Sequence, residues 1–347
     1  MIAPDSAVDA EAERLFRALL AVDCEPGRPP WNLEACRGIA PLTLEINRLK
    51  QEKGATILAH SYVEPEIVYG VADFRGDSYY LSLQARKSQA KMIVFAGVVF
   101  MAETVKILCP EATVVVPDRA SGCSLADSLT GAELRRLKKL YPGAAVVCYI
   151  NSTAEVKAES DVCVTSGNVV AIVAGLPERQ ILFVPDRLMA QNIRTELRQR
   201  GVDKEIVSSD GTCIVHEVFD ADQVADARAR FPGLKVVAHP ECPSEVAAAA
   251  DFVGSTGAMM KYVKTTAAPY YLMLTECGLV GRLQVEAPEK HFIGGCRVCP
   301  YMKLNSLAKI RDALAAPRPD QIVTLDPDVS RRAARCIERM FELAPTD

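Results

Sequence analysis

The chain has 347 residues, of which 49% are hydrophobic and 24% charged, an ordinary composition for a globular protein with a buried core. Its 40 lysines and arginines are balanced by 44 aspartates and glutamates, so no basic surplus indicates nucleic acid or an anionic membrane as a partner. The longest apolar stretch, residues 92–102, is too short to span a bilayer, and the acidic first residues do not resemble a secretory signal. We therefore expect a cytoplasmic protein.

The predicted elements begin with an amphipathic helix at residues 9–21, after which one pattern occurs three times. Each repeat opens with an apolar strand, at 55–60, 144–149 and 234–239. A helical stretch and a second apolar strand follow in each repeat, the strands at 91–97, 179–186 and 269–276. The last elements are a strand at 321–325 and a helix at 329–343.

Strands that alternate with helices at this spacing indicate parallel sheets with right-handed crossovers. The sequence therefore predicts an α/β fold of three pseudo-equivalent α/β domains, whose parallel sheets are arranged around a pseudo-threefold axis. We expect the first domain to contain residues 1–112 and 300–347, which include the N- and C-terminal helices. The second would contain residues 113–200 and the third residues 201–299.

The repeat also places polar residues in register. A ring-bearing residue ends each first strand, at spacings of 89 and 90 residues: His60, Tyr149 and His239. An aspartate and then a hydroxyl follow in each repeat: Asp73, Asp161 and Asp251, then Ser78, Ser166 and Thr256. Ligands of parallel sheets gather at strand carboxyl ends, and helix N-termini, which these hydroxyls precede, suit carboxylate or phosphate. We expect one shared anion site. The alternatives are ordinary N-caps for the hydroxyls and core positions for the histidines.

Three of the twelve cysteines occupy the same place in each repeat. Cys123, Cys213 and Cys299 lie 48 to 52 residues beyond the repeat aspartates, in glycine-containing loops. Three thiolates converging on the axis would form a metal site with one open position. The metal could be a [4Fe–4S] cluster or a zinc ion, and the alternative is three inert loop cysteines.

The other cysteines have no equivalents in register. Cys296 is a spare thiol and a candidate redox partner of Cys299, while His216, three residues after Cys213, is either a neighbour of the metal site or structural. The rest are expected to be structural: Cys24, Cys36, Cys109, Cys148, Cys163, Cys242, Cys277 and Cys336.

The chain resembles the quinolinate synthase family of de novo NAD biosynthesis. The resemblance rests on stretches that run in family order from about residue 45 to residue 312, among them AHSYVEPEI, ASGCSLADS, YINSTAEVKA, GTCIVHEVF, HPECPSEV and CPYMKLNSLAKI. It implies one [4Fe–4S] cluster per chain on Cys123, Cys213 and Cys299. It also implies condensation of iminoaspartate with dihydroxyacetone phosphate to give quinolinate, phosphate and water. The iron of the cluster that has no cysteine ligand would act as a Lewis acid in this reaction. An aspartate-oxidising enzyme would supply the imine.

The resemblance also implies a set of substrate-binding residues. They are His60, Tyr62, Ser78, Tyr149, Ile150, Asn151, Ser166, His239, Pro240, Glu241 and Thr256. We expect Tyr62 and Glu241 to be the acid/base pair, because each lies two residues beyond a strand-end ring, and His60 and Tyr149 to assist them. Rival interpretations are another enzyme with three such domains around a three-cysteine cluster, which would transfer electrons or cleave S-adenosylmethionine, and a zinc-stabilised binding scaffold.

Overall fold

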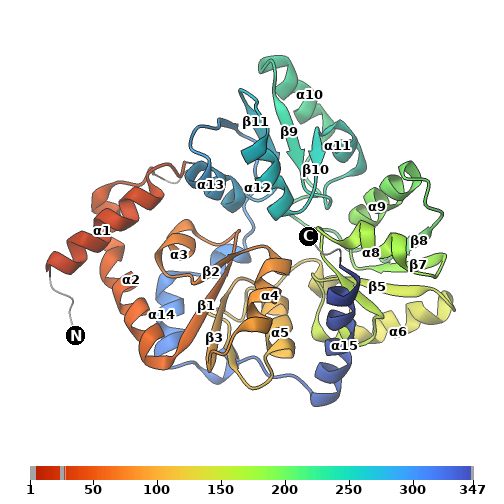
Figure 1. The fold of residues 1–347 in the computed structure, drawn as a ribbon, viewed down its shortest axis with the longest axis horizontal. Helices are drawn as coiled ribbons and strands as arrows, with labels where there is room; N and C mark the ends of the chain where they lie inside the picture. Colours follow the sequence, from red (N-terminus) through yellow and green to blue (C-terminus); the bar gives the residue numbers. More distant parts are fainter. Residues whose placement is uncertain (1–4, 24–26, 28, 345–347) are drawn as a thin grey trace.

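The computed structural model describes residues 5–23, 27 and 29–344, and it contains three parallel sheets of four strands (Figure 1). The first sheet has the order β2-β1-β3-β4, with strands β1 (Ala55–His60), β2 (Phe74–Gly76), β3 (Met92–Ala96) and β4 (Thr113–Val115). The second has the order β6-β5-β7-β8, with β5 (Ala145–Tyr149), β6 (Val162–Val164), β7 (Gln180–Val184) and β8 (Glu205–Ser208). The third has the order β10-β9-β11-β12, with β9 (Lys235–Ala238), β10 (Phe252–Val253), β11 (Tyr271–Leu274) and β12 (Phe292–Ile293).

This common strand order confirms the predicted fold class. In each unit the chain leaves the first strand toward one edge of the sheet and then crosses to the other side. Such a change of direction opens a crevice at the carboxyl ends of the two central strands. Those ends belong to β1 and β3, β5 and β7, and β9 and β11, and Figure 1 shows the three units grouped around a common centre.

The repeated aspartates hold the first two strands of each unit together. Oδ2 of Asp73 accepts the backbone N–H of Ile57 at 2.8 Å, and the N–H of Asp73 donates to the carbonyl of Ile57 at 3.0 Å. The same pair of bonds joins Asp161 to Val146 and Asp251 to Val236, with carboxylate distances of 2.7 and 2.9 Å. These aspartates therefore fix the loop that enters the second strand and are structural.

Helices cover the sheets. In the first unit they are α3 (Pro65–Gly70), α4 (Ser78–Lys87) and α5 (Val99–Leu108). In the second they are α6 (Gly131–Leu140), α7 (Ala154–Ala158), α8 (Val169–Gly175) and α9 (Arg187–Gln199). In the third they are α10 (Ala221–Arg230), α11 (Ser244–Ala249), α12 (Thr256–Thr265) and α13 (Cys277–Glu286). None of the helices in the described part of the chain has the length and apolar character that a membrane span requires.

The ends of the chain pack on two different units. The predicted N-terminal helix is α1 (Asp5–Leu19), and it packs against α2 (Leu33–Lys53), which also contacts α14 (Leu307–Ala315) beside the first sheet. Helix α15 (Pro327–Leu343) instead packs against α7 and β6 of the second unit. Residues 300–344 are therefore shared between two units by contact. The domain boundaries predicted from the sequence stay predictions.

The predicted strand at 321–325 is wrong. A short 3₁₀ turn occupies Pro319–Gln321, and only Ile322 forms a bridge, antiparallel to Val115. Beyond this bridge the segment does not pair with β4, and Asp326 already accepts the first N–H groups of α15.

Candidate active site

A cavity of about 450 Å³ lies where the three units meet. Its walls contain the predicted metal ligands and all but one of the predicted substrate-binding residues. They are Cys123, Cys213, Cys299, His60, Tyr62, Ser78, Tyr149, Ile150, Asn151, Ser166, His239, Glu241 and Thr256. Pro240 is not among the lining residues; its carbonyl accepts a hydrogen bond from Asn192 at 2.9 Å. Segments almost 240 residues apart in sequence thus meet at one site.

The two strand-end histidines have matching environments. Nδ1 of His60 accepts the backbone N–H of Tyr62 at 3.2 Å, and Nδ1 of His239 accepts that of Glu241 at 3.4 Å. A neutral ring that accepts at Nδ1 carries its proton on Nε2. Burial lowers the pKa of both rings to about 3. Both histidines are therefore neutral near pH 7, and each has an Nε2–H available to donate.

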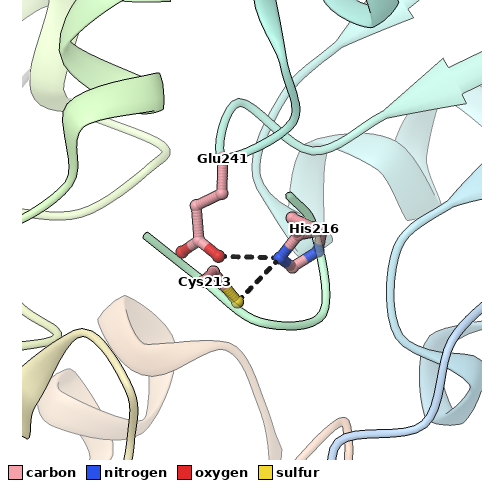
Figure 2. A group of neighbouring side chains, drawn as sticks. All are labelled: Cys213, His216 and Glu241. Atoms are coloured by element: carbon pink, nitrogen blue, oxygen red, sulfur yellow. Dashed lines mark hydrogen bonds and ion pairs between the residues drawn. The ribbon is translucent and has the colours of Figure 1, made fainter. Parts of the chain in front are cut away.

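Glu241 is the buried charge at the centre of the site, with 3% of its surface exposed. Its carboxylate accepts hydrogen bonds from the Tyr149 hydroxyl at 2.6 Å and from Nδ1 of His216 at 2.7 Å. Figure 2 shows Glu241, His216 and Cys213 turned toward one another. Burial by itself would raise the pKa of Glu241, but the rings of His239 and His216 and these hydrogen bonds hold the pKa well below its usual range.

The phenols beside this carboxylate are held in their protonated form. Burial raises the pKa of Tyr149, and the nearby charge of Glu241 raises it further. Burial also raises the pKa of Tyr62, whose hydroxyl is hydrogen-bonded to that of Thr275 at 2.9 Å. The site thus combines an ionised carboxylate with two phenols that keep their protons.

The three repeat hydroxyls are not the caps of their helices. The N-caps of α4, α8 and α12 are Asp77, Asn168 and Ser255, and the N-cap interpretation is therefore wrong. Ser78 and Thr256 are the first residues of α4 and α12, and Ser166 lies three positions before α8. All three line the cavity. Within the described residues their hydroxyls form no hydrogen bond with the protein, so they are free to bind a ligand.

The chain makes the same turn after each of the three cysteines. The N–H of the residue four positions later donates to the cysteine carbonyl, at 2.9 Å for Cys123, 2.9 Å for Cys213 and 3.2 Å for Cys299. The N–H groups two and three positions later donate to the sulfur: Leu125 and Ala126, Val215 and His216, Tyr301 and Met302. The repeat therefore extends to the hydrogen bonds around each sulfur.

The surroundings of these three thiols are more typical of ligands of a metal cluster than of inert loop cysteines. Burial raises the pKa of Cys123 to about 12 and of Cys299 to about 11, and it also raises the pKa of Cys213, while the N–H groups just described act in the opposite direction. A bound metal reverses this balance, because a coordinating thiol is deprotonated outright. Hydrogen bonds from backbone N–H groups to cysteine sulfur are among the features that tune iron–sulfur clusters. Three half-buried sulfurs with these donors, facing one cavity, fit a three-cysteine cluster.

A second donor set overlaps the first. The ligand atoms of Cys213, His216 and Glu241 lie within 4.8 Å of one another and could hold a single metal ion (Figure 2). A metal ion bound by this set would use only Cys213 of the three repeat cysteines. It would also replace the hydrogen bond between His216 and Glu241. Under the zinc alternative, these three residues would be the ligands of the zinc ion.

The structure corrects the predicted partner of Cys296. Cys296 forms a disulfide with Cys277, which the sequence grouped with the structural thiols, and not with Cys299. Cys277 is the first residue of α13, and the register of the repeat gave no sign that it approaches the loop of Cys299. Cys24 lies outside the described residues.

Three residues that support the site were missed in the sequence. Glu276, fully buried, accepts the backbone N–H of Cys299 at 3.2 Å and caps α13. Asp186, also fully buried, caps α9 and follows β7 as Glu276 follows β11. Their 90-residue spacing at the ends of the second strands was a usable signal, because it equals the spacing of the ring residues. The third, Thr275, carries no such signal.

Comparisons with known proteins agree with this arrangement. The family model described as quinolinate synthetase A protein matches residues 44–342. A quinolinate synthase of Caulobacter vibrioides is 47% identical over 310 residues, which cover 88% of this chain and 83% of the relative. Quinolinate synthase 2 of Mesorhizobium japonicum is 47% identical over 313 residues, covering 90% and 94%, and a quinolinate synthase of Agrobacterium fabrum is 46% identical over 298 residues, covering 86% and 84%. The chain therefore belongs to the quinolinate synthetase A family.

Proposed function

We propose that this chain condenses iminoaspartate with dihydroxyacetone phosphate to give quinolinate, phosphate and water, with one [4Fe–4S] cluster held by Cys123, Cys213 and Cys299. One observation carries the proposal: a single cavity, formed by all three units, contains three equivalent thiols and the acid/base pair of Tyr62 and Glu241, with Tyr149 hydrogen-bonded to Glu241. Membership of the family supports it. The overall reaction balances without an added oxidant or reductant.

Both substrates are anionic, and the chain can bind them without a basic surface. The hydroxyls of Ser78, Ser166 and Thr256 lie at or just before helix N-termini, where hydrogen-bond donation to carboxylate and phosphate oxygens is favourable. The neutral rings of His60 and His239 add Nε2–H donors. Such neutral donors orient an anion without forming an ion pair that would have to be broken when product leaves.

Glu241 is suited to accept a proton and the tyrosines to supply one. As an ionised carboxylate near pH 7, Glu241 can remove the proton that C–C bond formation releases, while Tyr62 and Tyr149 keep protons for the leaving oxygens. Its pKa is low in the empty cavity, but binding of an anionic substrate raises the pKa of a neighbouring carboxylate and so makes Glu241 a better base. A [4Fe–4S] cluster on three cysteines would leave one iron open as a Lewis acid toward a substrate oxygen.

Iminoaspartate is the product of oxidising the amine of aspartate, so we also propose that an aspartate-oxidising enzyme supplies it. Imines hydrolyse in water, which favours prompt transfer between the two enzymes. The cytoplasmic location that the sequence predicts stays a prediction.

The experiment is an anaerobic assay for quinolinate, with iminoaspartate generated in the reaction and dihydroxyacetone phosphate added. Product should form only when both substrates are present and should need no added reductant. A protein with its full complement of iron that forms no quinolinate would refute the proposed reaction. Turnover that requires a reductant would favour an electron-transferring relative instead.

A further inference from the structure

Lys157 is the one lysine or arginine that is fully buried in the described part of the chain. It lies in α7, and its Nζ donates to the carbonyl of Ile150 at 2.9 Å and to the carbonyl of Ser152. The same Nζ lies over the ring of Phe100, 5.4 Å from its centre. Ile150 and Phe100 line the central cavity, so this cation lies directly behind the cavity wall.

The repeat does not require a lysine at this position. Counted from the strand-end ring, the equivalent residues are Val68 in α3 and Ala247 in α11. An apolar side chain fills such a position favourably, whereas a buried ammonium loses its hydration and needs hydrogen bonds in return. Within the described residues Lys157 forms no ion pair with a carboxylate, so backbone carbonyls are its hydrogen-bond partners. This departure from the repeat indicates a role that only the second unit needs.

That role concerns the residue two positions beyond each strand-end ring. In the three units this residue is Tyr62, Asn151 and Glu241, and all three line the cavity. In the first and third units Nδ1 of the histidine ring accepts the backbone N–H of this residue. Tyr149 has no ring nitrogen, and its hydroxyl donates to Glu241 instead. The second unit therefore has to hold Asn151 by other means.

The loops also close differently. In the first and third units the backbone N–H of the next residue donates to the carbonyl of the histidine, from Val63 at 3.2 Å and from Cys242 at 3.0 Å. In the second unit the side-chain hydroxyl of Ser152 donates to the carbonyl of Tyr149 at 2.7 Å. The loop after β5 thus has its own conformation, which the histidine loops do not share.

Lys157 holds this loop on both sides of Asn151. Its two acceptors belong to Ile150 and Ser152, the residues immediately before and after Asn151. Because both carbonyls are bound by one ammonium, the backbone of Asn151 has little freedom to turn. Its side chain is thereby kept in the cavity, where Nδ2 lies 3.5 Å from Oε1 of Glu241.

We propose that Lys157 is a positioning residue: by binding the carbonyls on both sides of Asn151, it does in the second unit what the ring nitrogens of His60 and His239 do in the other two. The inference rests on the proposed function, because it takes Asn151 as a substrate-binding residue. Lys157 is not among the residues that line the cavity, so it acts on substrate only through Asn151.

The test compares Lys157→Met, which keeps the unbranched side chain but removes its charge and donors, with Lys204→Met. Lys204 is the matched control in the same unit, since its Nζ also binds two carbonyls two residues apart, those of Leu176 and Glu178. Neither of these residues lines the cavity. We expect Lys157→Met to raise KM for at least one substrate by roughly 10-fold to 100-fold, the range for a lost hydrogen bond to a charged group. Its kcat and iron content should stay close to wild type, and Lys204→Met should leave KM unchanged even where it lowers stability.

A double-mutant cycle with Asn151→Ala tests whether Lys157 acts through Asn151. If it does, Lys157→Met should raise KM much less in the Asn151→Ala background than in wild type. An unchanged KM in Lys157→Met, or additive effects in the double mutant, would overturn the inference. Should Lys157→Met fail to fold, Lys157→Gln replaces it, because its neutral amide is one atom shorter. A smaller rise in KM with the same coupling to Asn151 is then expected, and additive effects would again overturn the inference.

Hydrogen exchange of residues 149–153 gives a second measurement that needs no turnover. Exchange in this loop should be faster in Lys157→Met than in wild type and unchanged in Lys204→Met. Equal exchange in all three proteins would contradict the positioning role. Wild-type protein that makes no quinolinate would refute the proposed function instead, and the exchange rates would still decide whether Lys157 holds the loop.

Discussion

Removal of the Tyr149 hydroxyl tests the electrostatic account of the site. This hydroxyl donates to Glu241 at 2.6 Å, inside a cavity where the carboxylate is almost completely buried. A hydrogen bond to a charged group contributes about 1.5–3 kcal/mol, and Tyr149→Phe removes it without changing the ring. Since 1.4 kcal/mol corresponds to a factor of ten, we expect kcat/KM to fall by roughly 10-fold to 150-fold.

The assay is the initial rate of quinolinate formation under anaerobic conditions, with iron content and thermal unfolding measured on the same preparation. Tyr271→Phe is the matched control. Tyr271 is also buried, and its hydroxyl donates to the backbone carbonyl of Thr266, away from the cavity. It should affect stability alone. If Tyr149→Phe retained kcat/KM within about twofold of wild type, or lost no more than Tyr271→Phe, the hydrogen bond to Glu241 would have no part in the reaction.

Three further predictions follow from the same geometry. Cys123→Ser should abolish the cluster, whereas Cys296→Ala should retain it, as iron and sulfide analysis would show; the opposite result would refute the ligand assignment. His60 and His239 have pKa values of about 3 in the fold against 6.5 as a reference, so the unfolded chain binds protons first as pH falls. The free energy of unfolding should therefore be highest above pH 6.5 and should decrease as the pH falls below that value. The decrease should be up to ~1.4 kcal/mol per pH unit for each ring. Denaturant unfolding between pH 7 and 5 checks this, and substituting either histidine by glutamine should reduce the slope. Asp161→Ala should lower the free energy of unfolding by about 1–3 kcal/mol with KM unchanged, because its carboxylate bonds only backbone; a large rise in KM would contradict this structural role.

Much of the fold and the site was predictable because the chain repeats itself. One repeat alone would have left His60 or Cys123 ambiguous, since a buried histidine or a loop cysteine is ordinary. Recurrence at equal spacing placed their counterparts at the same ends of equivalent strands, and parallel sheets bring such ends together. The helix N-caps were predictable only to within one or two residues, because Asp77, Asn168 and Ser255 are as good caps as the hydroxyls near them.

What the sequence did not reveal depends on tertiary contacts outside the repeat. Helix α2 contains Pro41, which argues against a helix locally, but packing against α1 and α14 stabilises it. The Cys277–Cys296 disulfide joins segments with no counterpart in the other units. Thr275 is an ordinary strand-end residue until the fold brings Tyr62 and His216 to its two sides. Pairings of this kind have no local pattern to detect.

The central claim is that three units each supply one thiolate to a single cluster. The most direct test is to count iron, acid-labile sulfide and zinc per chain in protein purified without oxygen, for wild type and for Cys299→Ser. We predict about four irons and four sulfides in wild type and loss of both in Cys299→Ser. One zinc per chain, retained in Cys299→Ser, would contradict the claim, because Cys213, His216 and Glu241 would then hold the metal without the cysteine loop that follows β12.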